Sequence, residues 1–309
     1  MLISIKTATE ITNVADRTIR NWIEEGKIKK YDDESGVLRI DKEEFLKQIP
    51  TVLTVFNQKG GVGKTSTSVI LADYFAKKGI KTLLVDFDQQ GNLSQTYFEY
   101  DDIKNSLTLF DYFYNKTVIS KIIKKYDENI DVLPADIKLS RKDNISLEDM
   151  PELKKDFLPI FKKYSVVIVD CPPALNSFSR FGIMLANYVI CPVHPSAYSY
   201  DGAFEVLNTI NKFIPKFNDE CYDYRFLISK HHNRRYVIKD EYIEQYKNNF
   251  KNKLLEATIP EFVGVEERAV SFTNIFDMYP ETDKMIQKIK EMCEEIKEMV
   301  YDKRGMIDG

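Results

Sequence analysis

The sequence predicts an α/β fold, in which a doubly wound, mostly parallel sheet carries a glycine-rich loop and follows a small N-terminal unit. Short β-branched runs without polar alternation indicate parallel strands that are covered on both faces. Longer segments with helical periodicity separate these runs, which favours right-handed crossovers. The pattern begins at Thr51, directly after a proline. The predicted strands are residues 51–56, 81–87, 130–134, 165–170, 188–193 and 225–229.

The composition fits a soluble protein with one large domain and one small one. The chain has 309 residues, of which 43% are hydrophobic and 30% are charged, and a net charge of −4. We expect no membrane span and no signal peptide, because no apolar run of suitable length occurs. The cysteines are far apart and form no CxxC motif, which argues against a disulfide framework or a metal site. These features predict a cytoplasmic location. The cysteines are Cys171, Cys191, Cys221 and Cys293.

The segment FNQKGGVGKTS has the context of a phosphate-binding loop. It joins the first predicted strand to a helix predicted over residues 64–78, with Gly79 as its C-cap. Backbone N–H groups at a helix N-terminus favour anionic phosphate, and glycines let the backbone approach closely. The standard GxxxxGK[ST] pattern would need glycine at position 58, where this chain has Gln58 followed by an additional lysine. The predicted nucleotide-binding residues are Lys59, Gly60, Gly61, Val62, Gly63, Lys64, Thr65 and Ser66.

This variant loop resembles the deviant Walker A motif of the ParA/MinD family of P-loop ATPases. The segment VDFDQQGN resembles the switch I motif of the family, although Gln89 stands where proline is usual. VVIVDCPPAL resembles the Walker B and switch II motif, and CPVHPSAYSYDGAFEVL resembles the strand and helix that follow it. The likeness covers about residues 51–300. It implies the doubly wound fold, binding of ATP with Mg²⁺, and an ATP-dependent homodimer.

The resemblance also implies roles for two lysines. Lys64 would neutralise the β- and γ-phosphates. Lys59 would reach across the dimer to the partner's phosphates, as an arginine finger does, a contribution of about 10³–10⁵ in rate in other NTPases. Hydrolysis would then depend on dimerisation.

Four other side chains complete the predicted catalytic and metal set. The hydroxyl of Thr65 would ligate Mg²⁺, and Asp170 would hold the ion through water. Asp88 would orient the attacking water, although an acid beside Gly91 could simply cap a turn. Asp86 would support either the metal shell or the loop.

Residues 1–48 are predicted to form one domain and residues 49–309 another. The N-terminal segment resembles a helix-turn-helix of the MerR or excisionase type, with a turn at residues 13–15, Asp16 as N-cap and a small wing at residues 31–40. Its nine Lys and Arg against ten Asp and Glu in residues 1–50 weaken the case for tight DNA binding by one copy. A dimerisation or adaptor module is the alternative. The predicted core is Ala8, Ile11, Val14, Ile19, Trp22 and Ile23, and the predicted base-contacting residues are Arg17, Thr18, Arg20 and Asn21.

A second candidate DNA surface lies at residues 225–253. This stretch has eight Lys and Arg against three Asp and Glu. ParA-type ATPases bind DNA non-specifically as ATP dimers through basic residues in this half of the chain. The predicted contacts are Lys230, Arg234 and Arg235, and a solvated helix face is the alternative reading of the same charges.

The last predicted helix carries an apolar stripe that includes Met285, Ile289 and Met292. In MinD relatives such a helix binds membrane. Four glutamates on the helix would repel anionic headgroups, so we expect the stripe to pack against the sheet. The aromatic-rich residues 96–115 are expected to form core and interface.

The leading functional prediction is a ParA-type ATPase for plasmid or chromosome segregation, associated with the nucleoid. A centromere-binding partner would stimulate its hydrolysis, and the N-terminal unit could add operator binding and autorepression. The alternatives are an ATP-switched repressor with little turnover and a MinD-like positioning ATPase. A metabolic role like that of nitrogenase iron protein or dethiobiotin synthetase is disfavoured by the missing cluster cysteines and by the N-terminal unit. The adenine base is expected near Ser229 and Pro260.

Overall fold

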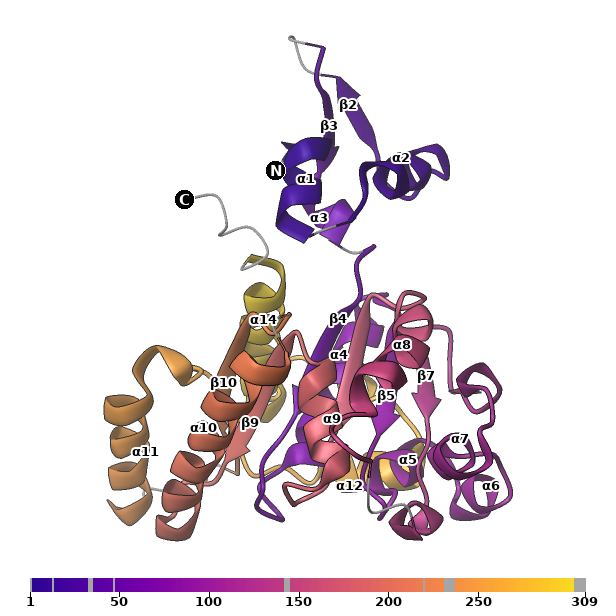
Figure 1. Cartoon of the computed structure of the whole chain (residues 1–309). Coiled ribbons are helices and arrows are strands. Elements are labelled where there is room, and N and C mark those ends of the chain that lie inside the picture. Colours follow the sequence, from indigo (N-terminus) through magenta and orange to yellow (C-terminus); the bar gives the residue numbers. More distant parts are fainter. Residues whose placement is uncertain are drawn as a thin grey trace.

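The computed structural model describes residues 2–12, 14–32, 36–46, 48–141, 145–218, 220–230 and 237–302. In these residues the chain forms a three-stranded sheet in the order β1-β3-β2 and a seven-stranded sheet in the order β10-β9-β4-β8-β5-β7-β6. Figure 1 shows the small sheet with its helices outside the layers of the large one. The large sheet has helices on both faces, which confirms the predicted α/β fold.

Six strands of the large sheet run parallel and correspond to the six predicted runs. The sequence missed the edge strand β6 (Lys124–Lys125), which pairs antiparallel with β7. Two lysines carry no apolar pattern, so only pairing with a neighbour defines this strand. The parallel strands are β4 (Thr51–Val55), β5 (Thr82–Asp86), β7 (Ile130–Leu133), β8 (Val166–Asp170), β9 (Tyr188–Val193) and β10 (Asp223–Ile228).

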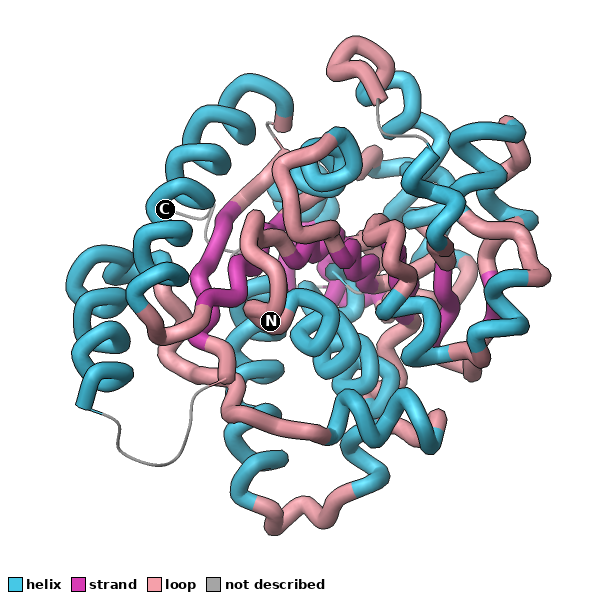
Figure 2. Tube along the Cα trace, turned by 90° about the horizontal axis from the view of Figure 1, so that it is seen from below, coloured by secondary structure: helices cyan, strands magenta, loops and turns pink. Residues whose placement is uncertain are grey.

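Helices cover the sheet on both sides, with the strands as the central layer in Figure 2. One core cluster contains side chains of α4 (Lys64–Lys77), α5 (Asn92–Tyr97), α12 (Gly264–Ser271), α13 (Ile275–Met278) and α14 (Lys284–Asp302). The opposite cluster contains side chains of α7 (Leu109–Asn115), α8 (Met150–Phe161), α9 (Ser177–Leu185), α10 (Ala197–Phe217) and α11 (Val237–Phe250). Shorter helical turns are α6 (Tyr100–Lys104), η1 (Ile119–Lys121), η2 (Ile137–Arg141) and η3 (Lys251–Lys253).

The apolar stripe of α14 packs against the sheet, as predicted. Ile289, Met292 and Ile296 are fully buried in the core cluster. Glu295 accepts hydrogen bonds from the backbone N–H groups of Glu256 and Ala257 at 2.9 and 2.8 Å, so this acid also positions the chain that follows η3. None of the helices in the described ranges is long and apolar enough to span a bilayer.

The N-terminal unit has its own small core, and two helices lie on either side of a short turn. The predicted N-cap at Asp16 is wrong by one position. Ala15 is the N-cap, and its carbonyl accepts the N–H of Ile19, while Asp16 pairs with Arg20 at 2.5 Å in the first turn. Predicted core residues Ala8 and Ile19 are buried, whereas the side chain of Ile11 lies outside the described residues. The elements are β1 (Leu2–Ser4), α1 (Ile5–Thr12), α2 (Asp16–Glu24), β2 (Lys30–Asp32), β3 (Leu38–Asp41) and α3 (Lys42–Leu46).

Candidate active site

The glycine-rich loop links β4 to α4. Gly61 and Gly63 have φ values of +72° and +91°, a left-handed conformation that glycine adopts without a steric penalty. Gly63 is the N-cap of α4, so the loop ends where backbone N–H groups of the helix are unpaired. The helix ends one residue before the predicted position, with Lys78 as C-cap and Gly79 next in the left-handed conformation.

Lys64 and Thr65 lie at the start of α4 and point in different directions. The buried Lys64 donates from Nζ to the carbonyl of Lys59 at 3.0 Å. Burial lowers the pKa of Lys64, an effect that the charge of Asp170 opposes. Thr65 donates from Oγ1 to Oδ2 of Asp170 at 2.7 Å. Ser68, one turn later, donates to the other oxygen of Asp170 at 3.1 Å.

Asp170 and Asp86 lie side by side at the carboxyl ends of β8 and β5, where the two strands pair in register. Both side chains are fully buried. Burial raises the pKa of Asp170 to about 7, and burial together with the charge of Asp170 raises the pKa of Asp86 to about 8. Two adjacent buried carboxylates, one of them near Lys64, therefore form a site that favours an additional cation.

Asp86 also holds the loop that follows β5. Its Oδ1 accepts the N–H of Asp88 at 3.0 Å, and its Oδ2 accepts the N–H and hydroxyl of Ser94 at 2.9 and 2.7 Å. Asp88, 7% exposed, accepts the N–H of Gln90 at 3.0 Å. Gly91 has φ +66°, and a Cβ there would lie 2.9 Å from a backbone oxygen. Asp86 was expected to support either the metal shell or the loop, and these hydrogen bonds are those of a residue that supports the loop.

The donor set fits a magnesium ion with few protein ligands. In the part of the chain that the structure describes, no group of three or more His, Cys, Asp or Glu side chains could hold a metal. Magnesium in nucleotide sites is usually held by one or two protein groups together with phosphate oxygens and water. Thr65 and Asp170, already in contact at the end of the loop, match that pattern.

A cavity of about 270 Å³ opens beside the loop. Gly61, Gly63 and Thr65 line one side, and residues 229–230 and 259–266 line the other. Ser229 donates from Oγ to the carbonyl of Val62 at 2.5 Å, which fixes the end of β10 against the loop. Both positions expected near the base, Ser229 and Pro260, therefore line the cavity.

Lys230, which was predicted to contact DNA, also lines this cavity. It is half-buried and has a φ of +55°, uncommon for a residue with a Cβ. Sequence reasoning placed it in a run of positive charge, whereas the structure places it beside the phosphate loop. The other predicted contacts of this surface, Arg234 and Arg235, lie outside the described residues.

Lys59 has a backbone fixed by hydrogen bonds and a side chain that lies over an aromatic ring. Its N–H is held by Oδ1 of Asn57 at 2.9 Å, and its carbonyl binds Lys64. Its own ammonium group is half-buried and lies 5.8 Å from the centre of the Tyr198 ring, at the start of α10. Tyr198 is 84% exposed. This tyrosine could not be singled out from the sequence, because more than a hundred residues of chain separate it from Lys59.

The predicted base-contacting residues of the N-terminal unit lie on α2. Arg17, Arg20 and Asn21 are exposed, and Thr18 is half-buried. Arg20 is occupied by its ion pair with Asp16. Their contact with DNA stays a prediction.

Comparison with known proteins shows the family of the chain. A family model described as an AAA domain matches residues 50–222. The chain is 30% identical over 220 residues to the chromosome-partitioning ATPase Soj of Treponema pallidum, which covers 70% of this chain and 85% of the relative. The chain belongs to the ParA/Soj family of P-loop ATPases. It is also 29% identical over 226 residues to the chromosome partitioning protein ParA of Caulobacter vibrioides, at 70% and 82% coverage.

Solved structures share the fold of the larger domain. Cobyrinic acid a,c-diamide synthase from Mycobacterium smegmatis, solved with ADP and magnesium, has a TM-score of 0.68 at 23% identity and covers 81% of this chain and 95% of its own. A plasmid partition protein from Borrelia burgdorferi has a TM-score of 0.62 at 23% identity and covers 81% and 99%. At these identities the likeness concerns the fold.

Proposed function

We propose that this protein is a magnesium-dependent ATPase of DNA segregation that acts as an ATP-bound homodimer. The observation that carries the ATPase chemistry is the contact of Thr65 with Asp170, with Lys64 buried beside them and Asp88 on the adjoining loop. These groups gather where a P-loop and the ends of two parallel strands meet. The partition function is supported by the names of the relatives, a chromosome-partitioning ATPase and ParA.

Each group of the site has a role that follows from its chemistry. Lys64 would leave the carbonyl of Lys59 to pair with phosphate, since an ammonium group gains more from an anion than from a neutral oxygen. Thr65 and Asp170 would hold Mg²⁺, which neutralises charge on the phosphates when bound. Asp88 would orient the attacking water, and Asp86 would keep the loop of Asp88 in place.

Lys59 is the residue that would link hydrolysis to dimerisation. Its ammonium group is not buried with Lys64 but rests over an exposed tyrosine, so it is available to a second subunit. A cation that arrives only on dimerisation would stabilise charge that develops on the transferred phosphoryl group. The protein would therefore turn over ATP as a pair.

DNA and a partner protein complete the proposal. Non-specific DNA binding by the ATP dimer would use basic residues near the end of β10. The N-terminal unit would add operator binding through Arg17, Arg20 and Asn21 of α2, and with it autorepression. A centromere-binding partner would stimulate hydrolysis and release the DNA, and the protein would associate with the nucleoid.

The test is binding to a long duplex of arbitrary sequence at a fixed, stated salt concentration, with ATP, with ADP and without nucleotide. We expect binding with ATP and Mg²⁺ and little binding otherwise, because only the dimer presents two basic surfaces. Lys64→Ala is the control and should remove the ATP dependence. Equal binding in all three conditions would contradict the nucleotide gate.

An ATP-switched repressor is the second candidate, favoured by the exposed arginines on α2. ATP turnover with the long duplex present distinguishes the two. A repressor would bind a specific operator tightly and show no stimulation of turnover.

A further inference from the structure

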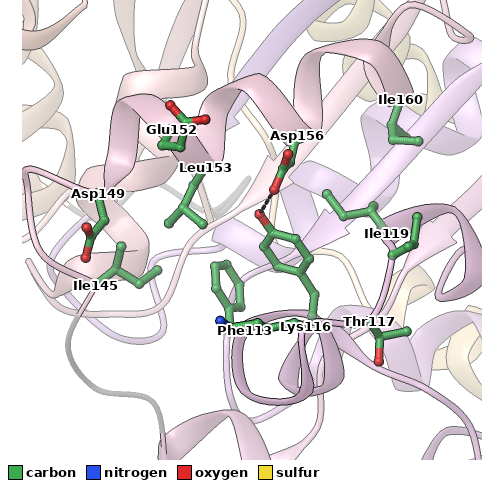
Figure 3. Close-up of a pocket in the computed structure, with 12 residues that line it drawn as sticks. Phe113, Lys116, Thr117, Ile119, Ile145, Asp149, Glu152, Leu153, Asp156 and Ile160 are labelled. Carbon is green, nitrogen blue, oxygen red and sulfur yellow. Dashed lines mark hydrogen bonds between the residues drawn. The ribbon is translucent and has the colours of Figure 1, made fainter.

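A second cavity, of about 620 Å³, lies between α7 and α8, away from the phosphate loop. Its size is in the range of ligand sites in proteins. Its walls are largely apolar, with Phe113 on α7, Ile119 on η1, and Leu153 and Ile160 on α8. Figure 3 shows the α8 side chains on one side of the cavity and Phe113 on the other. Val118, at the rim, is 60% exposed although it is apolar.

The cavity has an acidic edge. Asp149 is the N-cap residue of α8, and Glu152 and Asp156 lie on the helix. Among the residues that line the cavity only Lys116 carries a positive charge. Asp156 accepts a hydrogen bond from the hydroxyl of Tyr112 at 2.8 Å. Glu152 pairs with Lys155 at 2.6 Å, but both side chains are more than two-thirds exposed, so this pair is readily exchanged.

We propose that this cavity docks a segment of a partner protein that carries an apolar side chain flanked by lysine or arginine. The apolar side chain would enter between Phe113 and Leu153, and the flanking cations would pair with the carboxylates of α8. Charge complementarity and the size of the largely apolar cavity carry the proposal.

The spacing of the carboxylates favours a peptide over a small amine. Asp149 and Asp156 are seven positions apart on a helix, a separation of about 10 Å along its axis. A single ammonium group can meet only one of these acids at a time. Two or three cations along a peptide can meet the whole row, which gives the site its selectivity.

A chain of packed aromatic rings connects the cavity with the catalytic loop. The ring of Phe113 lies 5.2 Å from that of Phe178 on α9, and Phe178 lies 5.9 Å from Phe87. Phe87 stands between Asp86 and Asp88 in the chain. Tyr112 makes a second connection through Phe157, whose ring lies 6.1 Å from Phe87.

An occupied cavity should therefore report on the nucleotide state. If nucleotide shifts the loop of Asp86 and Asp88, we expect the aromatic rings packed against it to shift as well. Nucleotide would then change the affinity for peptide, and by linkage peptide would change the affinity for nucleotide by the same factor. This nucleotide dependence rests on the proposed function, whereas docking to the nucleotide-free chain does not.

The experiment uses the full chain and an array of fluorescein-labelled ten-residue peptides in which the spacing of leucine and lysine varies. Fluorescence anisotropy measures binding without nucleotide, with ADP, and with a non-hydrolysable ATP analogue plus Mg²⁺. We expect at least one spacing to bind with a Kd below about 100 μM. The same peptides with glutamate in place of lysine should not bind.

Two matched pairs of variants locate the site. Asp149→Asn with Glu152→Gln should weaken binding about tenfold, whereas Asp101→Asn with Asp102→Asn, which removes two exposed charges from the first turn of α6, should not. Val118→Ser should weaken binding about threefold, whereas Val270→Ser, at an 83% exposed position, should not. All six positions are exposed, so the substitutions leave the buried core unchanged.

Three results would overturn the proposal: no binding of any peptide, equal loss in the α6 control, or displacement by octylamine at a comparable concentration. The last would assign the cavity to a small amine. An affinity difference of about fivefold between ADP and the ATP analogue supports the linkage, and its absence in a protein shown to bind both nucleotides removes the linkage. Lys64→Ala should keep nucleotide-free docking and lose that difference, so failure of the ATPase proposal is distinguishable from failure of docking.

Discussion

Two buried carboxylates contact α4 in different ways: Asp73 belongs to the helix, and Asp170 at the end of β8 contacts Thr65 and Ser68 near its start. Asp73 meets Arg268 of α12 through three contacts of 2.9 to 3.2 Å, and it also accepts the hydroxyl of Tyr97 and the N–H of Ile275. Asp170, beside the start of the helix, has hydroxyl partners, Thr65 and Ser68. Both acids are fully buried.

This difference in hydrogen-bond partners indicates a structural role for Asp73 and a cation-binding role for Asp170. Arg268 is fully buried, donates also to the carbonyl of Thr96, and lies 3.8 Å from the centre of the Tyr97 ring. Its hydrogen bonds tie α4, α5 and α12 together. Burial raises the pKa of Asp73, Asp170 and Asp86. At Asp73 the bidentate ion pair with Arg268 opposes that effect, whereas at Asp170 the hydroxyl of Thr65 and the charge of Lys64, which makes no ion pair with it, oppose it. A folded protein that keeps a pair of acids such as Asp170 and Asp86 is prepared to bind a cation.

The largest expected effect is at Lys59. Lys59→Ala should bind ATP normally but lose about 10³-fold or more in turnover, because the site would lack the cation delivered by the partner. Steady-state turnover and binding of a fluorescent ATP analogue measure the two properties. Lys64→Ala is the control and should lose nucleotide binding itself. Wild-type turnover in Lys59→Ala would remove the in-trans role.

The next largest effect concerns the stability that the ion pair of Asp73 with Arg268 provides. Arg268→Met should lower the free energy of unfolding by about 3–5 kcal/mol, because it leaves Asp73 charged and unpaired in the core. Urea denaturation measures it. The double variant Asp73→Leu with Arg268→Met should recover part of the loss. A loss below about 1 kcal/mol in the single variant would show that the pair is not needed for stability.

Asparagine substitutions at Asp170 and at Asp73 should change the free energy of unfolding in opposite directions. Asp170→Asn should raise the free energy of unfolding of the nucleotide-free protein by about 1–3 kcal/mol at pH 8, since it removes a fully buried charge whose pKa burial has raised to about 7. Asp73→Asn should lower it, since Arg268 loses its counter-ion. Asp170→Asn should also lose the stabilisation that Mg²⁺ and ATP give. Destabilisation by both changes would refute the distinction drawn between the sites.

The pH dependence of stability follows from the same acids. The pKa of Asp170 is about 7 and that of Asp86 about 8 in the folded protein, against an ordinary value near 3.8. Between about pH 4 and pH 8 these two carboxyl groups are ionised in the unfolded chain but still protonated in the folded chain. Their contribution to the free energy of unfolding therefore falls as the pH rises through this range. Thermal unfolding at pH 5.5 to 8.5 measures this, and Asp170→Asn should flatten the slope.

The sequence predicted the structure best at strands whose residues are all buried and at loop positions whose backbone conformation requires glycine. Six parallel strands and the loop of Gly61 and Gly63 could be predicted because their patterns are local. The edge strand β6 and the bond between Asp73 and Arg268 could not, since each depends on a partner distant in the chain. Lys230 lies in a stretch rich in lysine and arginine, but its place beside the phosphate loop depends on how β10 ends, which the sequence does not show. Its contact with DNA stays a prediction.

The smallest effect concerns two of the cation–aromatic contacts, those of Arg268 and Lys59. Arg268 is enclosed between the rings of Tyr97 and Tyr126, whereas Lys59 rests over the exposed Tyr198 at 5.8 Å. An exposed contact of this kind contributes about 0.5–1 kcal/mol, so Tyr198→Ala should free Lys59 and tighten ATP-dependent dimerisation about two- to fivefold. Tyr198→Phe keeps the ring and should match the wild type. Analytical ultracentrifugation with a non-hydrolysable ATP analogue measures the dimer constant, and a weaker dimer in Tyr198→Ala would place this tyrosine in the interface instead of in the resting position of Lys59.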